Sequence, residues 1–420
     1  MTLNWFLSRT VRHALAMAKH VQKILNHQRD ILPPPAVEGV QAAIRDLKQA
    51  ATSGADNETL GKHMDTLEKA ASKWLKPYPN AGWRENVEVL LVALTVAMGI
   101  RTFILQPFKI PTGSMQPTLY GVTSVPDFTS RWWEEVRGQS NPPPIEIPAR
   151  WERIRSWFAG TSYLHIQAKA DGELENVDPT IEFLGFQIRQ PVKLLIFNIV
   201  ETLRIGGKTY WIWFPPDYGG STLALRAGLR PGTFYKKGDD VVRMKIISGD
   251  HLFVDRVSYN FRRPTRGEII VFETRGIHGL QQDQFYIKRM VALGDENVQV
   301  GDDRHLRING TRLDAGTPHF QNVYSFNPKD PPRESQYSGH VNDKVVRESY
   351  PNFPGELAPL FPDGTSTYTV QPDHYMVMGD NTMNSLDSRT WGDFPASNVI
   401  GQSFFVYWPI SDRFGWGYKR

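Results

Sequence analysis

The chain has 420 residues, with 48 Lys and Arg against 44 Asp and Glu, and a formal net charge of +4. It contains no cysteine, which excludes disulfides, thiolate nucleophiles, iron–sulfur clusters and cysteine-based zinc sites. Charged residues make up 22% and hydrophobic residues 40%, so the chain is neither disordered throughout nor a multispanning membrane protein, and its small positive surplus gives no argument for nucleic acid.

Residues 1–82 have the apolar periodicity of helices. Apolar residues between Leu7 and Leu25 recur at alternating steps of four and three, which places them on one helix face. Prolines 33–35 end that helix, and two further periodic stretches follow. We expect a small helical hairpin or three-helix unit, and its composition permits a cytoplasmic position.

Three histidines, His13, His20 and His27, are seven residues apart on one face of the first predicted helix. Their spacing invites a metal site, but seven residues correspond to about 10.5 Å of helix rise, which is too far for one shared ion. We therefore interpret them as part of a polar helix face and expect no metal.

The segment from Val89 to Ile100 is apolar apart from Thr95 and carries no charge. The apolar segment between Glu88 and Arg101 is shorter than the roughly 20 residues needed to span the hydrocarbon of a bilayer. An arginine at the end of a helix can, however, extend its charged group toward the headgroups, which lengthens the usable segment. The expectation is one transmembrane helix at 83–105, with a buried core helix as the alternative. A cleavable signal peptide is disfavoured because the apolar run begins so far into the chain.

Beyond residue 105 the pattern changes to short alternating runs separated by Gly, Pro and Asp, which predicts an antiparallel sheet or folded barrel. Two stretches have the composition of insertions, namely 120–240 and 311–372. The motifs HExxH, GxGxxG, GxSxG and the P-loop are absent from the sequence, so a nucleophile would have to be a Ser, Thr, Lys or carboxylate. Ser114 follows the apolar segment in a rigid Pro/Gly loop, although a serine in such a loop is usually only a turn residue.

Four segments read together change that interpretation. They are PTGSMQPTL (111–119), SGDHLFVDR (248–256), YIKRMVALGDENV (286–298) and MGDNTMNSLDSRTWG (378–392). In content and order they resemble the boxes of bacterial type I signal peptidases, over about 110–119 and 248–408. The apolar segment also lies where that family has its anchor.

The resemblance implies a mainly β, antiparallel, barrel-like catalytic domain formed by 106–119, 241–310 and 373–410. It also implies a membrane-bound serine endopeptidase that removes signal peptides from exported preproteins at the outer face of the cytoplasmic membrane. The implied partners are preprotein signal peptides and the lipid bilayer, with an interaction with the export machinery left open; no cofactor and no nucleic acid are implied.

Ser114 matches the family's nucleophile and Lys288 its general base. A lysine with its ordinary pKa of about 10.4 cannot accept a proton from serine near neutral pH, so burial must lower that pKa by about 2 to 3. The apolar residues on either side of Lys288 suit such burial. Without the family boxes, a strand lysine with its ammonium in water would be the better interpretation.

The resemblance also assigns supporting residues. Ser385 matches the serine that orients the lysine, and Asp387 and Arg389 match a neighbouring ion pair, with Asn384 as a further support. The oxyanion donors would be the Ser114 N–H and the Thr112 hydroxyl, at a position where many members have serine.

The family selects small residues at the first and third positions before the cut. The matching lining positions, each of which is equally compatible with a place in the core, are Phe108, Ile110, Met115, Leu119 and Tyr286. An extended substrate would bind there by β-augmentation.

The 120–240 insertion lies outside the family pattern and contains half of the 12 tryptophans. They are Trp132, Trp133, Trp151, Trp157, Trp211 and Trp213. One interpretation is a β-rich lobe resting on the bilayer, because tryptophan favours membrane interfaces. The other is an ordinary domain whose tryptophans fill its own core.

Two other functions remain as alternatives. One is a self-cleaving Ser/Lys regulator, although 1–82 has no clear helix-turn-helix. The other is a non-catalytic envelope scaffold with the same fold, against which the intact Ser114, Lys288 and Ser385 argue.

Overall fold

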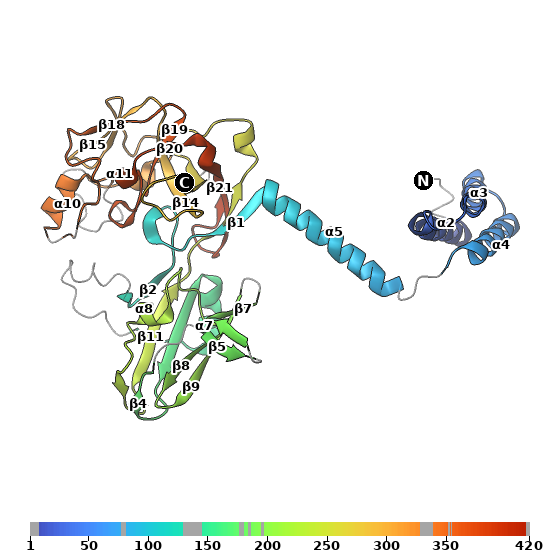
Figure 1. Ribbon diagram of the computed structural model, residues 1–420, viewed down its shortest axis with the longest axis horizontal. Helices are drawn as coiled ribbons and strands as arrows, with labels where there is room; N and C mark the ends of the chain where they lie inside the picture. Colours follow the sequence, from blue (N-terminus) through green and yellow to red (C-terminus); the bar gives the residue numbers. More distant parts are fainter. Residues whose placement is uncertain are drawn as a thin grey trace. The chain divides into compact units, whose positions relative to one another are not determined.

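The computed structural model describes residues 8–76, 81–128, 145–175, 180–183, 186–194, 197–327, 339–351, 353 and 355–416. These residues form two compact units, Met1–Val96 and Ala97–Arg420. Figure 1 shows helices in the first unit and mostly strands in the second. Trp132 and Trp133 of the predicted insertion lie outside the described residues.

The first unit is a bundle of three helices, α2 (Arg9–Gln28), α3 (Pro34–Ser53) and α4 (Asn57–Trp74), each in contact with the other two. Side-chain oxygens of Ser8 and Asp56 cap α2 and α4, and Gly54 ends α3 in the left-handed conformation. The bundle core contains the predicted apolar face of the first helix. The helical prediction for this region is thus confirmed in its three-helix form.

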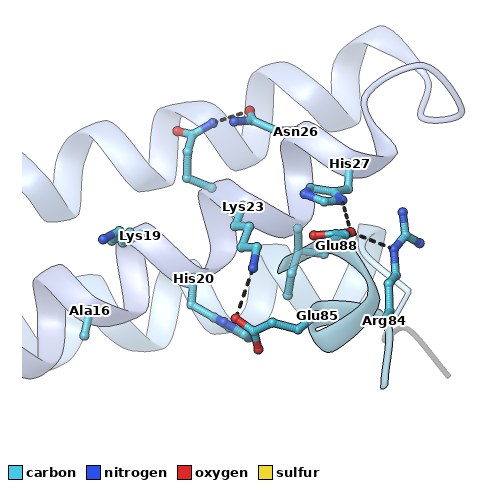
Figure 2. Close-up of a pocket in the computed structure, with 11 residues that line it drawn as sticks. Ala16, Lys19, His20, Lys23, Asn26, His27, Arg84, Glu85 and Glu88 are labelled. Atoms are coloured by element: carbon cyan, nitrogen blue, oxygen red, sulfur yellow. Dashed lines mark hydrogen bonds and ion pairs between the residues drawn. The ribbon is translucent and has the colours of Figure 1, made fainter. Parts of the chain in front are cut away.

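A pocket in the same unit lies between α2 and the start of α5 (Ala81–Phe103). Figure 2 shows its polar lining, in which Lys23 pairs with Glu85 at 3.4 Å and His27 lies 3.8 Å from Glu88. His20 also lines this pocket. Across the described residues, no three His, Asp or Glu side chains are grouped as metal ligands.

Helix α5 contains the apolar segment. Its span from Gly82 to Phe103 has 22 residues and a mean hydropathy of 1.5, and none of its apolar window is buried in protein. A core helix would be covered, so this exposure argues against the alternative of a buried core helix. By length and composition α5 is able to cross a bilayer.

The second unit is organised around an eight-stranded antiparallel sheet, which confirms the mainly β prediction. Its order is β1-β12-β21-β13-β14-β19-β20, with β22 beside β21. The strands are β1 (Leu105–Lys109), β12 (His251–Asp255), β21 (Val399–Trp408), β13 (Ile269–Glu273), β14 (Phe285–Leu293), β19 (His374–Met378), β20 (Phe394–Pro395) and β22 (Gly415–Trp416). The boxes at 248–256 and 286–298 contain strands of this sheet, the box at 111–119 follows β1, and the box at 378–392 runs from the end of β19 toward β20.

Most of the 120–240 insertion forms a β-rich lobe with its own apolar core. Its sheets contain β2 (Thr123–Val125), β3 (Thr161–Gln167), β4 (Gly172–Glu173), β5 (Thr180–Phe183), β6 (Phe186–Arg189), β7 (Val192–Leu194), β8 (Phe197–Ile205), β9 (Lys208–Trp213), β10 (Phe234–Tyr235) and β11 (Asp240–Ile247), with helices α7 (Arg150–Phe158) and α8 (Leu223–Ala227). Strand β11 pairs with β2 and β3 and contributes to the lobe core. Residues 241–247, which the sequence analysis assigns to the catalytic domain, thus pair with strands of the lobe.

A smaller four-stranded sheet has the order β17-β16-β15-β18, and its strands β17 and β18 come from the second predicted insertion. Its strands are β15 (Asn297–Val300), β16 (Leu306–Ile308), β17 (Thr311–Arg312) and β18 (Thr367–Thr369), with helices α9 (Gln321–Tyr324) and α10 (Asp343–Ser349) nearby in sequence. The cluster packed here also includes Val291, Met376 and Met378 of the main sheet. This core therefore supports β14 and β19 next to the candidate site.

Candidate active site

Ser114 lies in a single 3₁₀ turn, η1 (Gly113–Met115), and its side chain is buried. Asn381 fixes this turn from the last family box. Its Nδ2 donates to the Gly113 carbonyl at 3.1 Å, and its backbone N–H donates to the Ser114 carbonyl at 3.0 Å. The serine is therefore held by backbone contacts to a segment more than 250 residues away.

Lys288 lies in the middle of β14, where β13 pairs on one side and β19 on the other. Its Nζ donates to Ser114 Oγ at 2.6 Å, and both side chains are buried. Burial lowers the pKa of Lys288 to about 8, while the carboxylates of Asp387 and Asp380 act in the opposite direction. A neutral amine at this distance is placed to take the serine proton.

Asp387 and Arg389 form the predicted ion pair, and neither side chain is exposed. The guanidinium donates to both Asp387 oxygens, at 2.9 and 3.0 Å, and to the Thr382 hydroxyl at 2.7 Å. Burial by itself raises the pKa of Asp387, but Arg389 and the Gly379 N–H outweigh it, so the net shift is downward. The carboxylate therefore stays charged and favours the protonated form of Lys288.

A second buried ion pair, which the sequence analysis missed, involves Arg289, the residue that follows the lysine in β14. Arg289 donates to both oxygens of Asp380, at 2.7 and 2.5 Å, and to the Gly267 carbonyl at 2.7 Å. The Thr118 hydroxyl also donates to Asp380. These residues lie inside the matched boxes, but the resemblance assigns no role to them.

Ser385 does not make the predicted hydrogen bond to Lys288. Its hydroxyl is buried near Asp387 and helps to lower the pKa of that carboxyl, yet it has no hydrogen-bond partner among the described residues. Asn384 is exposed, with its amide nitrogen near Gly113. In this structure Lys288 is held by Ser114, and Ser385 lies beside them without a bond.

The two expected oxyanion donors lie next to each other. Thr112 is exposed and extended, with φ −117° and ψ 157°. Within the described part of the chain, neither its hydroxyl nor the Ser114 N–H donates to a protein acceptor. Both donors are therefore available to an incoming group.

The five expected pocket residues divide into two sets. Ile110, Met115 and Leu119 are at most 2% exposed and pack in one apolar cluster, to which the partly buried Phe108 also belongs. Tyr286 belongs to a different cluster, but its ring centre is 5.7 Å from Lys288 Nζ. Only Phe108 and Tyr286 have surface left for direct contact with a ligand.

Comparison with known proteins agrees with this arrangement. The model of the family described as "Signal peptidase, peptidase S26" matches residues 83–129 and 241–408, half of the chain. The chain belongs to this signal peptidase family. The match includes α5, the serine turn and the main sheet, whereas most of the lobe lies outside it.

Several named relatives belong to the same family. A probable signal peptidase I-1 of Synechocystis is 34% identical over 166 residues, covering 39% of this chain and 64% of that protein. A probable signal peptidase I-2 of the same organism is 30% identical, covering 38% and 56%. A probable thylakoidal processing peptidase 2 of Arabidopsis thaliana is 31% identical, covering 39% and 34%. The chain thus spans less than two thirds of the length of these relatives.

Among solved structures, a signal peptidase I from Enterococcus faecalis is similar. It is 25% identical, and the alignment covers 34% of this chain and 97% of that one with a TM-score of 0.21.

Proposed function

We propose that the chain is a membrane-anchored signal peptidase that uses Ser114 as nucleophile and Lys288 as general base. The observation that carries the proposal is the 2.6 Å hydrogen bond between Lys288 Nζ and Ser114 Oγ inside a buried site. A lysine with a pKa near 8 is a competent base near neutral pH, where an ordinary lysine is not.

In the proposed reaction, Ser114 Oγ attacks the scissile carbonyl as its proton passes to Lys288. The Ser114 N–H and the Thr112 hydroxyl would stabilise the oxyanion, since both lack protein acceptors among the described residues. The ammonium then protonates the leaving amine, and water hydrolyses the acyl-enzyme with Lys288 again as base. Asp387 and Arg389 would act as positioning residues, because their charges act on the pKa of Lys288 while their side chains bond to each other.

The proposed substrate is the signal peptide of an exported preprotein. Support comes from family membership and from β1, which is an edge strand of the main sheet and leads directly to Ser114. An extended peptide is able to add to such an edge. We place the second unit at the outer membrane face, with α5 as the anchor, because a secreted chain is cut after translocation.

The test is cleavage of a purified preprotein by the full chain in detergent. Wild type should produce the mature protein, and Ser114→Ala and Lys288→Ala should each lose activity by several orders of magnitude. Lys288→Arg keeps the positive charge but cannot release a proton, so it should also be inactive. Lys208→Ala, at an exposed strand end of the lobe, is the matched control and should keep full activity.

Retained activity in Lys288→Ala would remove the dyad assignment. An inactive but folded wild type, tested against several preproteins in lipid, would instead favour a non-catalytic scaffold.

A further inference from the structure

The tryptophans of the lobe that the structure describes do not fill its core. Trp151 is 79% exposed, Trp157 48%, Trp211 53% and Trp213 64%. The core consists of aliphatic residues and tyrosines. The interpretation of an ordinary domain with internal tryptophans is therefore wrong for these four.

Helix α7 concentrates this exposed apolar surface, since none of its residues is buried. Trp151, Ile154 and Phe158 are spaced by three and four, so they share one face, and they are 79%, 51% and 53% exposed. Arg150 and Arg155 flank that face, while Glu152 is on the opposite side of the helix. The result is a short cationic amphipathic helix with an uncovered apolar face.

Contacts join α7 to the end of the main sheet. The Trp157 ring centre is 6.2 Å from that of Trp408, and the Ile410 N–H donates to the Phe158 carbonyl at 3.3 Å. Ile410 is itself 62% exposed. The end of α7 thus lies beside the end of β21 and the exposed Ile410. Trp211 and Trp213 of β9 stack on each other and are not part of the α7 face.

Strand β1 connects this surface to the anchor. Strand β1 directly follows α5, and its register pairs Lys109 with His251, which in turn pairs with Trp408. From Leu105 to Lys109 the strand rises about 14 Å. Trp408, which α7 contacts, is therefore about one strand length from the end of α5, and an α5 inserted in a bilayer would hold α7 within reach of its surface.

We propose that α7 lies in the headgroup region of an anionic membrane, with Trp151, Ile154 and Phe158 against the acyl chains and Arg150 and Arg155 on lipid phosphates. Short amphipathic helices with apolar residues on one side and basic residues at its borders bind at this depth. A nine-residue helix is about 13 Å long and cannot span. The helix lies between the two segments that match the family model, so the contact is an addition of this chain.

The test uses the absence of cysteine, which makes any introduced cysteine the sole labelling site. The full chain carrying Ile154→Cys, Glu152→Cys or Lys208→Cys is labelled with an environment-sensitive fluorophore. Each is reconstituted in vesicles of phosphatidylcholine, with and without phosphatidylglycerol, containing lipids brominated on the acyl chain. The label at position 154 should be quenched several-fold more than the labels at 152 and 208. Phosphatidylglycerol should increase the difference.

Replacing Arg150 and Arg155 by glutamine in the Ile154→Cys chain should abolish the increase caused by phosphatidylglycerol. Equal quenching at 154 and 152, or none at 154, would overturn the proposal, and the second result would point to a protein partner for this face. The readout requires no peptidase activity and should be the same with Ser114→Ala, so its failure is distinguishable from failure of the proposed function.

Discussion

Arg289 and Asp380 form an ion pair in which neither side chain is exposed, one residue along β14 from Lys288. The pair ties β14 to the segment that follows β19, and Thr118 ties it to the loop after Ser114. Three parts of the site therefore meet at one carboxylate. The same carboxylate acts on the lysine, since its charge raises the pKa of Lys288 against the larger effect of burial.

Asp380→Asn should destabilise the fold by about 3 to 5 kcal/mol, because it leaves the buried Arg289 without its countercharge. Chemical unfolding of the full chain in detergent measures this. The matched control is Asp373→Asn, which breaks the exposed pair with Arg263 and should change stability by less than about 1 kcal/mol. Equal effects of the two variants would contradict the structural role assigned to the buried pair.

Gly379→Ala should abolish activity while the chain stays folded. A Cβ at this position would lie 2.5 Å from the Ser114 carbonyl oxygen and closer still to Ser385 Oγ, so the serine turn would have to move. Preprotein cleavage and circular dichroism together measure the result. Gly276→Ala is the control, because no atom would lie within 4 Å of its Cβ. The positive φ of Gly276 means that this variant should lose some stability, but it should keep its activity.

The proximity of Ser114 and Lys288 could be predicted from sequence, because both residues lie in boxes whose residue types match the family pattern. The predicted hydrogen bond from Ser385 to the lysine is absent. A motif could not have shown this, because whether two side chains form a hydrogen bond depends on their geometry in the folded chain. Asn381 and Asp380 were missed for a related reason. Their roles arise from burial and from contacts with segments more than 90 residues away, which the sequence does not display.

For the lobe formed by most of residues 120–240, the sequence predicts only that strands are abundant and does not predict how they pair. Strand β11 directly precedes a family box, yet it pairs with strands of the lobe. Its pairing with β3 is a long-range contact that alternation alone does not specify, because many registers satisfy the same pattern. The exposed tryptophans likewise could not be separated from core tryptophans by composition.

Thr112→Val should lower kcat for preprotein cleavage by about 10²- to 10³-fold with little change in KM, since the lost hydroxyl acts on the developing oxyanion. Thr112→Ser is the matched control and should retain activity because it keeps the hydroxyl. As Thr112 is exposed, neither variant should alter stability by more than about 0.5 kcal/mol. A valine variant with full kcat would exclude this residue from the oxyanion site.

Lys288→Met should stabilise the inactive chain near neutral pH. A lysine whose pKa falls from 10.5 to about 8 on folding destabilises the folded state by about 3 kcal/mol below pH 8. The methionine variant avoids this cost but loses the hydrogen bond to Ser114, which is worth about 1 kcal/mol. Between pH 8 and 10.5 the unfolded chain binds more protons, so wild-type stability rises with pH. The difference in unfolding free energy should therefore shrink across that window, and a constant difference would mean that Lys288 is not desolvated.

The pH profile of cleavage tests the same lysine in its proposed role. In the proposed mechanism neutral Lys288 is the active form. We therefore expect kcat/KM to decrease about tenfold for each pH unit well below pH 8 and to level off above pH 8. In Asp387→Asn the inflection should move to lower pH, because the Asp387 charge raises the Lys288 pKa and the Arg389 left behind lowers it. Glu356→Gln, at an exposed surface pair, should leave the inflection unchanged. An inflection that stays near 8 in Asp387→Asn would show that the measured base is not Lys288.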